Sequence, residues 1–217
     1  MIFDDRIYKL RQKLSLEKLD GMYVTNLTNV RYLTGFTGSA GSLLILEEEQ
    51  HFLTDGRYTA QCKDQIKNCE VHIVGSVHYK YIADNKMIAN KSTIGFEGDH
   101  MNVSTYENIK QLMANISWKK ISGIIEKIAA VKDMLEIDSL KTAIEITDEV
   151  FTKIIPELKE GAVERDIAAK ISYLFKTNGA EGDSYESIIG SGFLGALPHA
   201  RPTGKKFEKG DFVVMDF

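Results

Sequence analysis

His199 and Asp216 are two residues near the end of this 217-residue chain whose types could do chemistry. Pro198 fixes the backbone before His199 and Pro202 stiffens the far side, so the imidazole is expected on a constrained turn. Asp216 lies in the apolar run 212–217, where burying an uncompensated carboxylate costs at least several kcal/mol. The pattern predicts a cation, a metal ion or hydrogen-bond donors beside Asp216, and a hard divalent metal is one natural partner. The alternative is structural: Asp216 caps a strand end and His199 makes a hydrogen bond within its turn.

Two strands are needed to position these side chains. Residues 185–189 carry the aromatic and β-branched side chains typical of a strand, and the Gly-Ser-Gly sequence at 190–192 is expected to end it. Small residues there would let another backbone or a ligand come close. After the loop that carries His199, residues 210–211 turn the chain into a second strand, 212–217.

These pieces, taken in order, resemble a known family. YESIIGSG at 185–192, LPHA at 197–200 and GDFVVMDF at 210–217 are similar to the first half of the active site in the pita-bread metallopeptidases. Within that group they are most similar to the Xaa-Pro branch, aminopeptidase P and prolidase. The interval of 17 positions between His199 and Asp216 also matches. The combination is specific, although each piece alone is not.

The resemblance implies a function for each candidate residue. A carboxylate at the position of Asp216 binds or bridges a pair of divalent metal ions, with manganese expected first and cobalt or zinc as alternatives. An imidazole at the position of His199 contacts the substrate and helps to move a proton, so His199 is predicted to be catalytic and substrate-binding. Tyr185 is predicted to line the substrate pocket beneath the metals. The alternative for Tyr185, a core strand residue, stays open.

The implied activity is metal-dependent release of the N-terminal residue from peptides with proline in the second position. An aminopeptidase P and an Xaa-Pro dipeptidase fit equally well. The family's site also uses a second Asp, a His and two Glu residues further along than Phe217, so this chain alone is expected to be inactive and to hold no metal pair. Two alternatives stay open: a non-catalytic fragment or interaction module, and creatinase-like hydrolysis without metals.

Composition argues against several other classes of protein. The net charge is −4, from 27 basic and 31 acidic residues, and the basic residues are scattered, which disfavours nucleic-acid binding. Charges at positions 4–6 interrupt any signal-peptide core, and no apolar run approaches the roughly 18 residues of a membrane span, so a cytoplasmic protein without membrane contact is expected. Cys62 and Cys69 lack the CxxC pairing or clustered His of a zinc site and are predicted to be reduced structural thiols.

The rest of the chain predicts two domains. Helical and strand patterns alternate up to residue 128, which indicates an α/β domain of the creatinase/prolidase N-terminal type. Strands are expected at residues 22–24, 42–46, 51–54, 70–74 and 93–96, with helices at 3–19, 57–66, 79–89 and 104–113. From residue 129 the pattern changes to two long amphipathic helices, 133–158 and 163–174, the first with an apolar stripe through Leu140, Ile144 and Phe151. Residues 129–217 are predicted to be the first half of a pita-bread α+β domain.

The glycine-rich segment 29–41 lacks the Lys-Ser/Thr ending of a P-loop and the spacing of a dinucleotide fingerprint, which disfavours a phosphate site. Together with TDGRY at 54–58 it resembles the N-terminal domain of Xaa-Pro peptidases and creatinase. Asp55 and Arg57 are predicted to form a local ion pair at a strand-to-helix turn. Because relatives with this domain are commonly dimers, a homodimer is expected, with the loop 35–41 near the partner's catalytic half.

Overall fold

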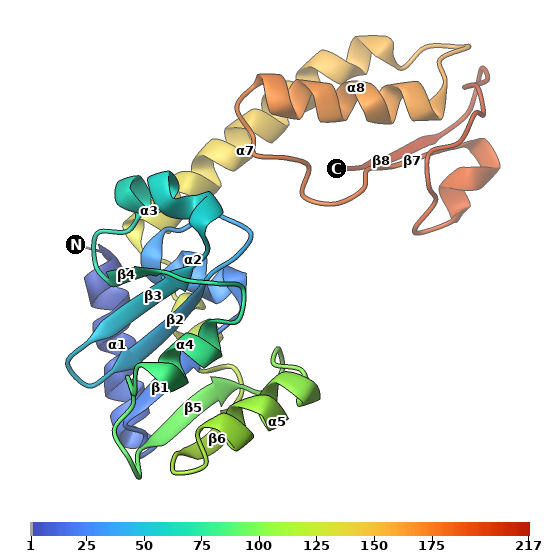
Figure 1. Cartoon of the computed structure of the whole chain (residues 1–217). Coiled ribbons are helices and arrows are strands. Elements are labelled where there is room, and N and C mark those ends of the chain that lie inside the picture. The colour runs from blue at the N-terminus through green and yellow to red at the C-terminus, as the bar shows by residue number, and fades with distance from the viewer. Residues whose placement is uncertain (1) are drawn as a thin grey trace. The chain divides into compact units, whose positions relative to one another are not determined.

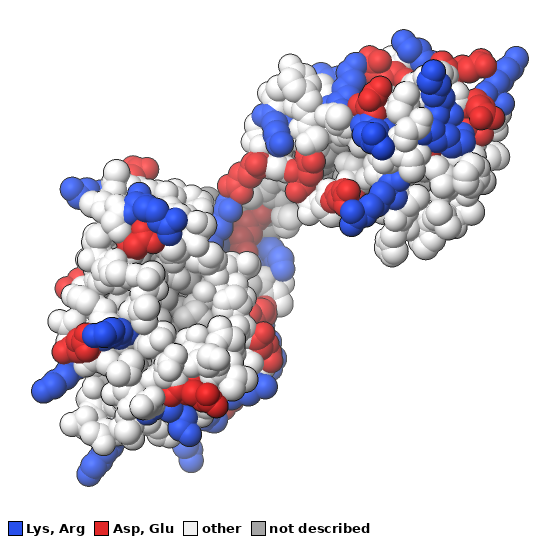
Figure 2. Space-filling view, turned by 45° about the vertical axis from the view of Figure 1, so that its right-hand side comes forward, with Lys and Arg blue, Asp and Glu red and all other residues white. Residues whose placement is uncertain are grey.

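The computed structural model describes residues 2–217. The chain forms two compact units: unit 1 extends to Val131, and unit 2 is Lys132–Phe217. Unit 1 is an α/β domain and unit 2 combines two long helices with a small sheet (Figure 1). The predicted mixed α/β fold is confirmed. In the described part of the chain no helix is both long enough and apolar enough to cross a bilayer. On the face shown in Figure 2, Lys and Arg side chains are interspersed with Asp and Glu over the surface of each unit.

Unit 1 is built on one six-stranded sheet with the strand order β4-β3-β2-β1-β5-β6. The strands are β1 Gly21–Val24, β2 Ser42–Leu46, β3 Gln50–Thr54, β4 Glu70–Ile73, β5 Thr93–Glu97 and β6 Ser117–Ile121. The pairs β1–β2 and β2–β3 are antiparallel, and β1–β5, β3–β4 and β5–β6 are parallel. The edge strand β4 therefore runs in the same direction as β3, so side chains from both can line up on one face.

Helices cover both faces of this sheet. They are α1 Ile2–Leu16, α2 Leu27–Thr34, the 3-10 turn η1 Gly56–Tyr58, α3 Thr59–Gln65, α4 His78–Asp84, α5 Val103–Leu112 and α6 Ile124–Ala129. Alternate residues of β2 belong to different cores: Leu43 packs in the cluster that includes α1 and α2, and Leu44 in the cluster that includes α4 and α5. Burial on both faces explains why the central strands are continuous apolar runs instead of alternating with polar residues.

The predicted elements of unit 1 are present, with ends shifted by a few residues, and three further elements were not predicted. Helix α2 overlaps the first part of the glycine-rich segment 29–41. Asn26 caps its start by accepting from the Thr28 amide, and Gly35 ends it in the left-handed region at φ 80°. Strand β6 has a largely exposed pattern, because it is an edge strand, and so lacks an apolar run. Helix α6 is only six residues long.

Unit 2 contains α7 Met134–Ile154, η2 Ile155–Glu157, α8 Glu164–Thr177, β7 Ile188–Ser191, η3 Gly192–Ala196 and β8 Val213–Asp216. A capping box of Asp133 and Glu136 starts α7. The core joins α7, α8 and β7 through Val150, Ile154, Ile167, Ile171, Phe175, Ile189 and Phe207. Val213 and Met215 of β8 pack against it. Strands β7 and β8 pair antiparallel.

The long helix expected at 133–158 is present as α7. Its stripe of Leu140, Ile144 and Phe151 is exposed by 52%, 60% and 48%, and the residues that α7 buries in the core are Val150 and Ile154. One sequence expectation for unit 2 is wrong. The strand expected at 185–189 lies at Ile188–Ser191, so the glycine at 190 and the serine at 191 belong to the strand. A side chain on Gly190 would meet the Leu194 carbonyl at 3.0 Å, so here the glycine allows η3 to approach the strand.

Candidate functional site

Asp216 is the last residue of β8 and pairs with Ile188 of β7. Its side chain is exposed, so the premise that this carboxylate is buried in an apolar strand is wrong. The two-stranded sheet has one face packed in the unit 2 core, and residues at alternate positions of β8, among them Asp216, face away from it. An exposed carboxylate keeps its oxygen atoms accessible to a ligand.

Tyr185 lies beside Asp216, and its hydroxyl donates a hydrogen bond to Asp216 Oδ1. This bond, made to the neutral phenol, raises the pKa of Tyr185 above its ordinary value. Tyr185 precedes β7 and is 48% exposed, so it is not a core strand residue. The structure thus brings together two of the three residues identified in the sequence, and the Tyr185 phenol is a hydrogen-bond donor to Asp216.

His199 lies on an exposed turn after η3 and, within residues 2–217, makes no hydrogen bond with Tyr185 or Asp216. The turn is anchored by its neighbour: Ala200 is buried, and its amide donates to the Leu197 carbonyl at 3.2 Å. The prediction of a constrained turn with an accessible imidazole is therefore confirmed, whereas its action on a substrate stays a prediction.

Glu164, the first residue of α8, is the residue in this region that sequence reasoning missed. Its side chain is fully buried, and its carboxylate accepts from the amide and hydroxyl of Ser191, both at 2.8 Å. The other oxygen accepts from the amide and hydroxyl of Thr203 at 3.0 Å and 2.6 Å. Burial raises the pKa of Glu164, but these four bonds more than offset that effect and hold it below its ordinary value. Glu164 therefore ties both ends of the loop that carries His199 to α8.

An ion pair beside this loop adds a further contact to Ser191. Lys205 Nζ lies 2.6 Å from Asp211 Oδ2 and donates to Ser191 Oγ at 3.1 Å. The bond to Asp211 raises the pKa of Lys205, and the same contact lowers the pKa of Asp211. Gly192 packs against this pair: it has φ 56°, and a Cβ there would lie 2.6 Å from Asp211 Oδ1.

An acidic residue in the first turn of a helix is common, so only the tertiary contacts distinguish Glu164 from an ordinary helix start.

The donor set around Asp216 does not by itself fit a pair of divalent ions. A catalytic metal site normally needs three or more protein ligands. Among residues 2–217, the groups of three or more metal-ligating side chains within reach of one ion do not include Asp216. Within residues 2–217, Asp216 therefore has no two further metal-ligating side chains within reach of the same ion.

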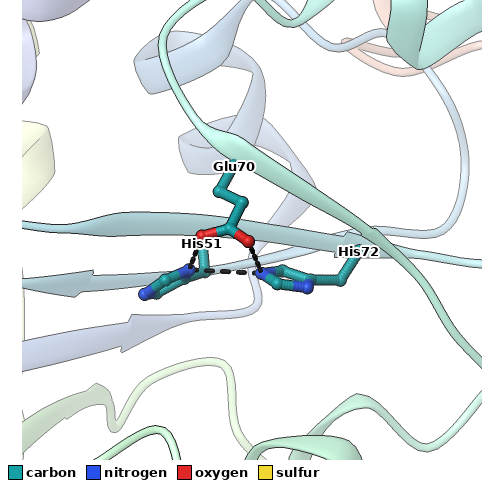
Figure 3. A group of neighbouring side chains, drawn as sticks. All are labelled: His51, Glu70 and His72. Atoms are coloured by element: carbon teal, nitrogen blue, oxygen red, sulfur yellow. Dashed lines mark hydrogen bonds and ion pairs between the residues drawn. The ribbon is translucent and has the colours of Figure 1, made fainter.

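The group of metal-ligating side chains that the structure does bring together lies in unit 1. His51 of β3 and Glu70 and His72 of β4 place their ligand atoms within 4.8 Å of one another (Figure 3). Burial lowers the pKa of His72, partly opposed by the charge of Glu70. The sequence showed no clustered histidines because 20 residues separate His51 from His72, and only the pairing of β3 with β4 joins them.

Two smaller predictions for unit 1 are confirmed. Asp55 accepts from the Arg57 Nε at 2.9 Å and forms the predicted local ion pair at 2.8 Å, and these bonds lower the pKa of Asp55 to about 2. The cysteines Cys62 and Cys69 are both free thiols, and burial raises the pKa of Cys69 to about 12.

Comparison with known proteins gives a consistent result along the chain. Residues 6–131 match the family Creatinase/Prolidase N-terminal domain, and residues 138–217 match Metallopeptidase family M24. The chain is 34% identical to "Uncharacterized peptidase YqhT" of Bacillus subtilis and 31% identical to an Xaa-Pro dipeptidase of Pyrococcus furiosus, in both cases over 98% of this chain and 60% of that protein.

Solved structures agree. An Xaa-Pro dipeptidase from Bacillus anthracis superposes with a TM-score of 0.88 at 31% identity, over 99% of this chain and 60% of that one. Prolidase from Pyrococcus furiosus superposes with a TM-score of 0.86 at 30% identity, over 96% of this chain and 64% of that one. The chain therefore spans about 60% of the length of the relatives that it matches.

Proposed function

This chain belongs to the creatinase/prolidase family of peptidases, and on that premise we propose that it forms part of a metal-dependent exopeptidase acting on Xaa-Pro peptides. The resemblance noted in the sequence and the fold class, a creatinase-like α/β domain followed by pita-bread residues, are both confirmed by these relatives. The proposed reaction releases the N-terminal residue from a peptide with proline in the second position. Aminopeptidase P and Xaa-Pro dipeptidase specificity are both consistent with it.

One observation carries the proposal. The segment that matches the metallopeptidase family, residues 138–217, presents Asp216 at the exposed end of β8, with the Tyr185 phenol beside it. We propose that Asp216 ligates a divalent metal, that Tyr185 lines the pocket next to it, and that His199 hydrogen-bonds the substrate and helps to move a proton. Glu164 would act as a positioning residue, because it holds the ends of the loop that carries His199.

The proposed cofactor is a pair of divalent ions, manganese first, with cobalt or zinc as alternatives. Such ions would polarise the scissile carbonyl when bound, and further ligands would have to come from outside residues 2–217. The proposed division into residues 1–128 and 129–217, the cytoplasmic location and the homodimer belong to the same proposal. Light scattering at micromolar concentrations tests the dimer, and a single monomeric species would contradict it.

The activity is tested on the product of the complete reading frame that contains these residues, loaded with Mn²⁺ and given a proline dipeptide and a tripeptide with proline second. We expect release of the N-terminal residue that a chelator abolishes. The 217-residue chain serves as the comparison and should release none, because it supplies one ligand of the metal pair. Absence of release by the complete product would instead favour a non-catalytic module.

The residue assignments are tested in the same protein. His199→Ala should lower turnover at least tenfold while metal content stays unchanged, because His199 acts on the substrate. Asp216→Asn should lower both metal content and turnover. Metal loss in His199→Ala, measured by elemental analysis, would show that its function is assigned wrongly.

A further inference from the structure

Strands β3 and β4 place three metal-ligating side chains on one face of the unit 1 sheet. His51 is directly opposite Glu70 in the parallel register, and His72 follows Glu70 by two positions, so all three side chains lie on the same side. Figure 3 shows the two imidazole rings and the carboxylate turned toward one another. Because all three residues are on neighbouring strands, their backbone positions are held by the sheet.

The distances among the ligand atoms of the three residues are close to those around a small tetrahedral ion. His51 Nδ1 lies 3.2 Å from His72 Nε2 and 3.3 Å from a Glu70 oxygen, and His72 Nε2 lies 3.8 Å from the other Glu70 oxygen. Zinc bound at about 2.0–2.1 Å in a tetrahedron separates its ligand atoms by roughly 3.3–3.4 Å. The distances from His51 Nδ1 to His72 Nε2 and to Glu70 fit this value within about 0.2 Å. The longer distance is made to the second Glu70 oxygen, so one carboxylate oxygen faces each ring.

The other nitrogen of each ring is also engaged, as in metal-binding histidines. His51 Nε2 lies 3.2 Å from a carboxylate oxygen of Glu49, and His72 Nδ1 lies 3.4 Å from the hydroxyl of Tyr81 on α4. Metal-ligating histidines almost always donate their second N–H to a carboxylate, carbonyl or similar acceptor, which fixes the tautomer. In the tautomer that donates to both outer contacts, the inward nitrogens, His51 Nδ1 and His72 Nε2, are the ones that would bind an ion.

The surroundings favour a cation and leave room for a fourth ligand. The His51 and His72 side chains are 8% and 14% exposed, whereas Glu70 is 67% exposed. His51 and Glu70 line a shallow surface depression together with the acidic residues Asp4, Glu48 and Glu49 and the basic residue Lys67. The rings are therefore shielded, and one side of the group is open to water.

We propose that His51 Nδ1, His72 Nε2 and the Glu70 carboxylate bind one divalent transition-metal ion of the zinc type, with water as the fourth ligand. Two imidazoles and one carboxylate form a donor set that suits zinc and its first-row neighbours better than magnesium or calcium. The site is in unit 1 and shares no residue with the proposed peptidase site, so it does not depend on the proposed function. The competing explanation is an ion-free N–H···N hydrogen bond between the rings.

The test is a zinc titration of the whole 217-residue chain after chelator treatment, in competition with a chromophoric zinc chelator. We expect one zinc per chain at this site. In Glu70→Gln and in His72→Ala the zinc affinity should be weaker by on the order of 100-fold. Glu70 is the decisive position because it is exposed, so its amide variant keeps the fold. The outer contact is tested by Glu49→Gln, which should weaken binding by about tenfold.

Two control variants test whether the zinc ion binds at this group of side chains. His100→Ala removes an exposed histidine outside the group, and Asp216→Asn removes the proposed ligand of the peptidase site; neither should change the zinc affinity. Cobalt substituted for zinc should show the intense visible absorption of a four-coordinate ion, and Glu70→Gln should abolish it. Equal zinc affinity in the wild-type chain and Glu70→Gln, or no bound equivalent, would overturn the proposal.

Discussion

Two groups of polar side chains in this molecule differ in what holds them together. In unit 1, His51, Glu70 and His72 lie on two hydrogen-bonded parallel strands, and their ligand atoms are all within 4.8 Å. In unit 2, Asp216 ends a strand while Tyr185 and His199 lie outside regular structure, and only the Tyr185–Asp216 contact is made.

The difference shows that strand register assembles a polar group on its own, whereas a loop-borne group needs additional anchors. Unit 2 supplies such an anchor in the buried carboxylate of Glu164, which no residue of the candidate site touches directly. The two groups should therefore respond differently to the same kind of change.

The largest expected effect follows from removing that anchor. Glu164→Ala leaves two amides and two hydroxyls without their buried acceptor, and should lower the free energy of unfolding of unit 2 by about 3 kcal/mol. Chemical denaturation with a probe in each unit measures it. The exposed neighbour Glu160→Ala is the matched control and should change stability by less than about 0.5 kcal/mol.

This loss of stability should be confined to unit 2. Zinc affinity at the group of His51, Glu70 and His72 should be the same in Glu164→Ala as in the wild-type chain, because the sheet of unit 1 holds those side chains. A parallel loss of both properties would mean that the two groups are not independent.

A smaller loss of stability is expected from a substitution at the start of η3. Gly192→Ala should lower stability by about 2 kcal/mol, because a left-handed conformation disfavours alanine and its Cβ would lie 2.6 Å from Asp211 Oδ1. Gly182→Ala is the control, since a Cβ at that position meets nothing within 4 Å. Thermal melting of the two variants side by side distinguishes a local strain from a general effect of losing glycine.

The pH dependence of stability should reflect Glu164. Its pKa is lower in the folded chain than the ordinary value of 4.5, so its carboxylate contributes stability that is present above that value and is lost as the pH falls below it. Glu164→Gln should therefore be less stable than the wild type at about pH 7, and the difference should shrink toward about pH 3. Melting curves across this range measure it, and a difference that grows on acidification would contradict the assignment.

The smallest effect concerns the contact between Tyr185 and Asp216. Asp216→Asn should lower the pKa of Tyr185 toward its ordinary value, because the charged acceptor that favours the neutral phenol is removed. Both side chains are exposed, so the free energy of unfolding should change little. NMR titration of the tyrosine rings, with Tyr185→Phe to assign the signal, checks the shift, and an unchanged pKa would show that the bond does not persist in solution.

Several features of the molecule were determined by local sequence. The apolar runs at β1, β2 and β5 mark strands buried on both faces, and the Asp133 and Glu136 pair marks the start of α7. The order of the pieces around His199 and Asp216 identified the family, and the local ion pair of Asp55 and Arg57 needed only a two-residue interval. Short-range patterns suffice wherever the interacting groups are neighbours along the chain.

Tertiary structure decided the features that depend on distant contacts. Glu164 resembles an ordinary first-turn acid until Ser191 and Thr203 are seen to donate to it, and Asp216 was expected to be buried until β8 was seen to have one open face. His51 and His72 are 21 positions apart, and become neighbours only because β3 pairs with β4. Burial and long-range pairing are properties of the folded chain, because they depend on which strands are adjacent, and the register of distant strands is not encoded in any short stretch of sequence.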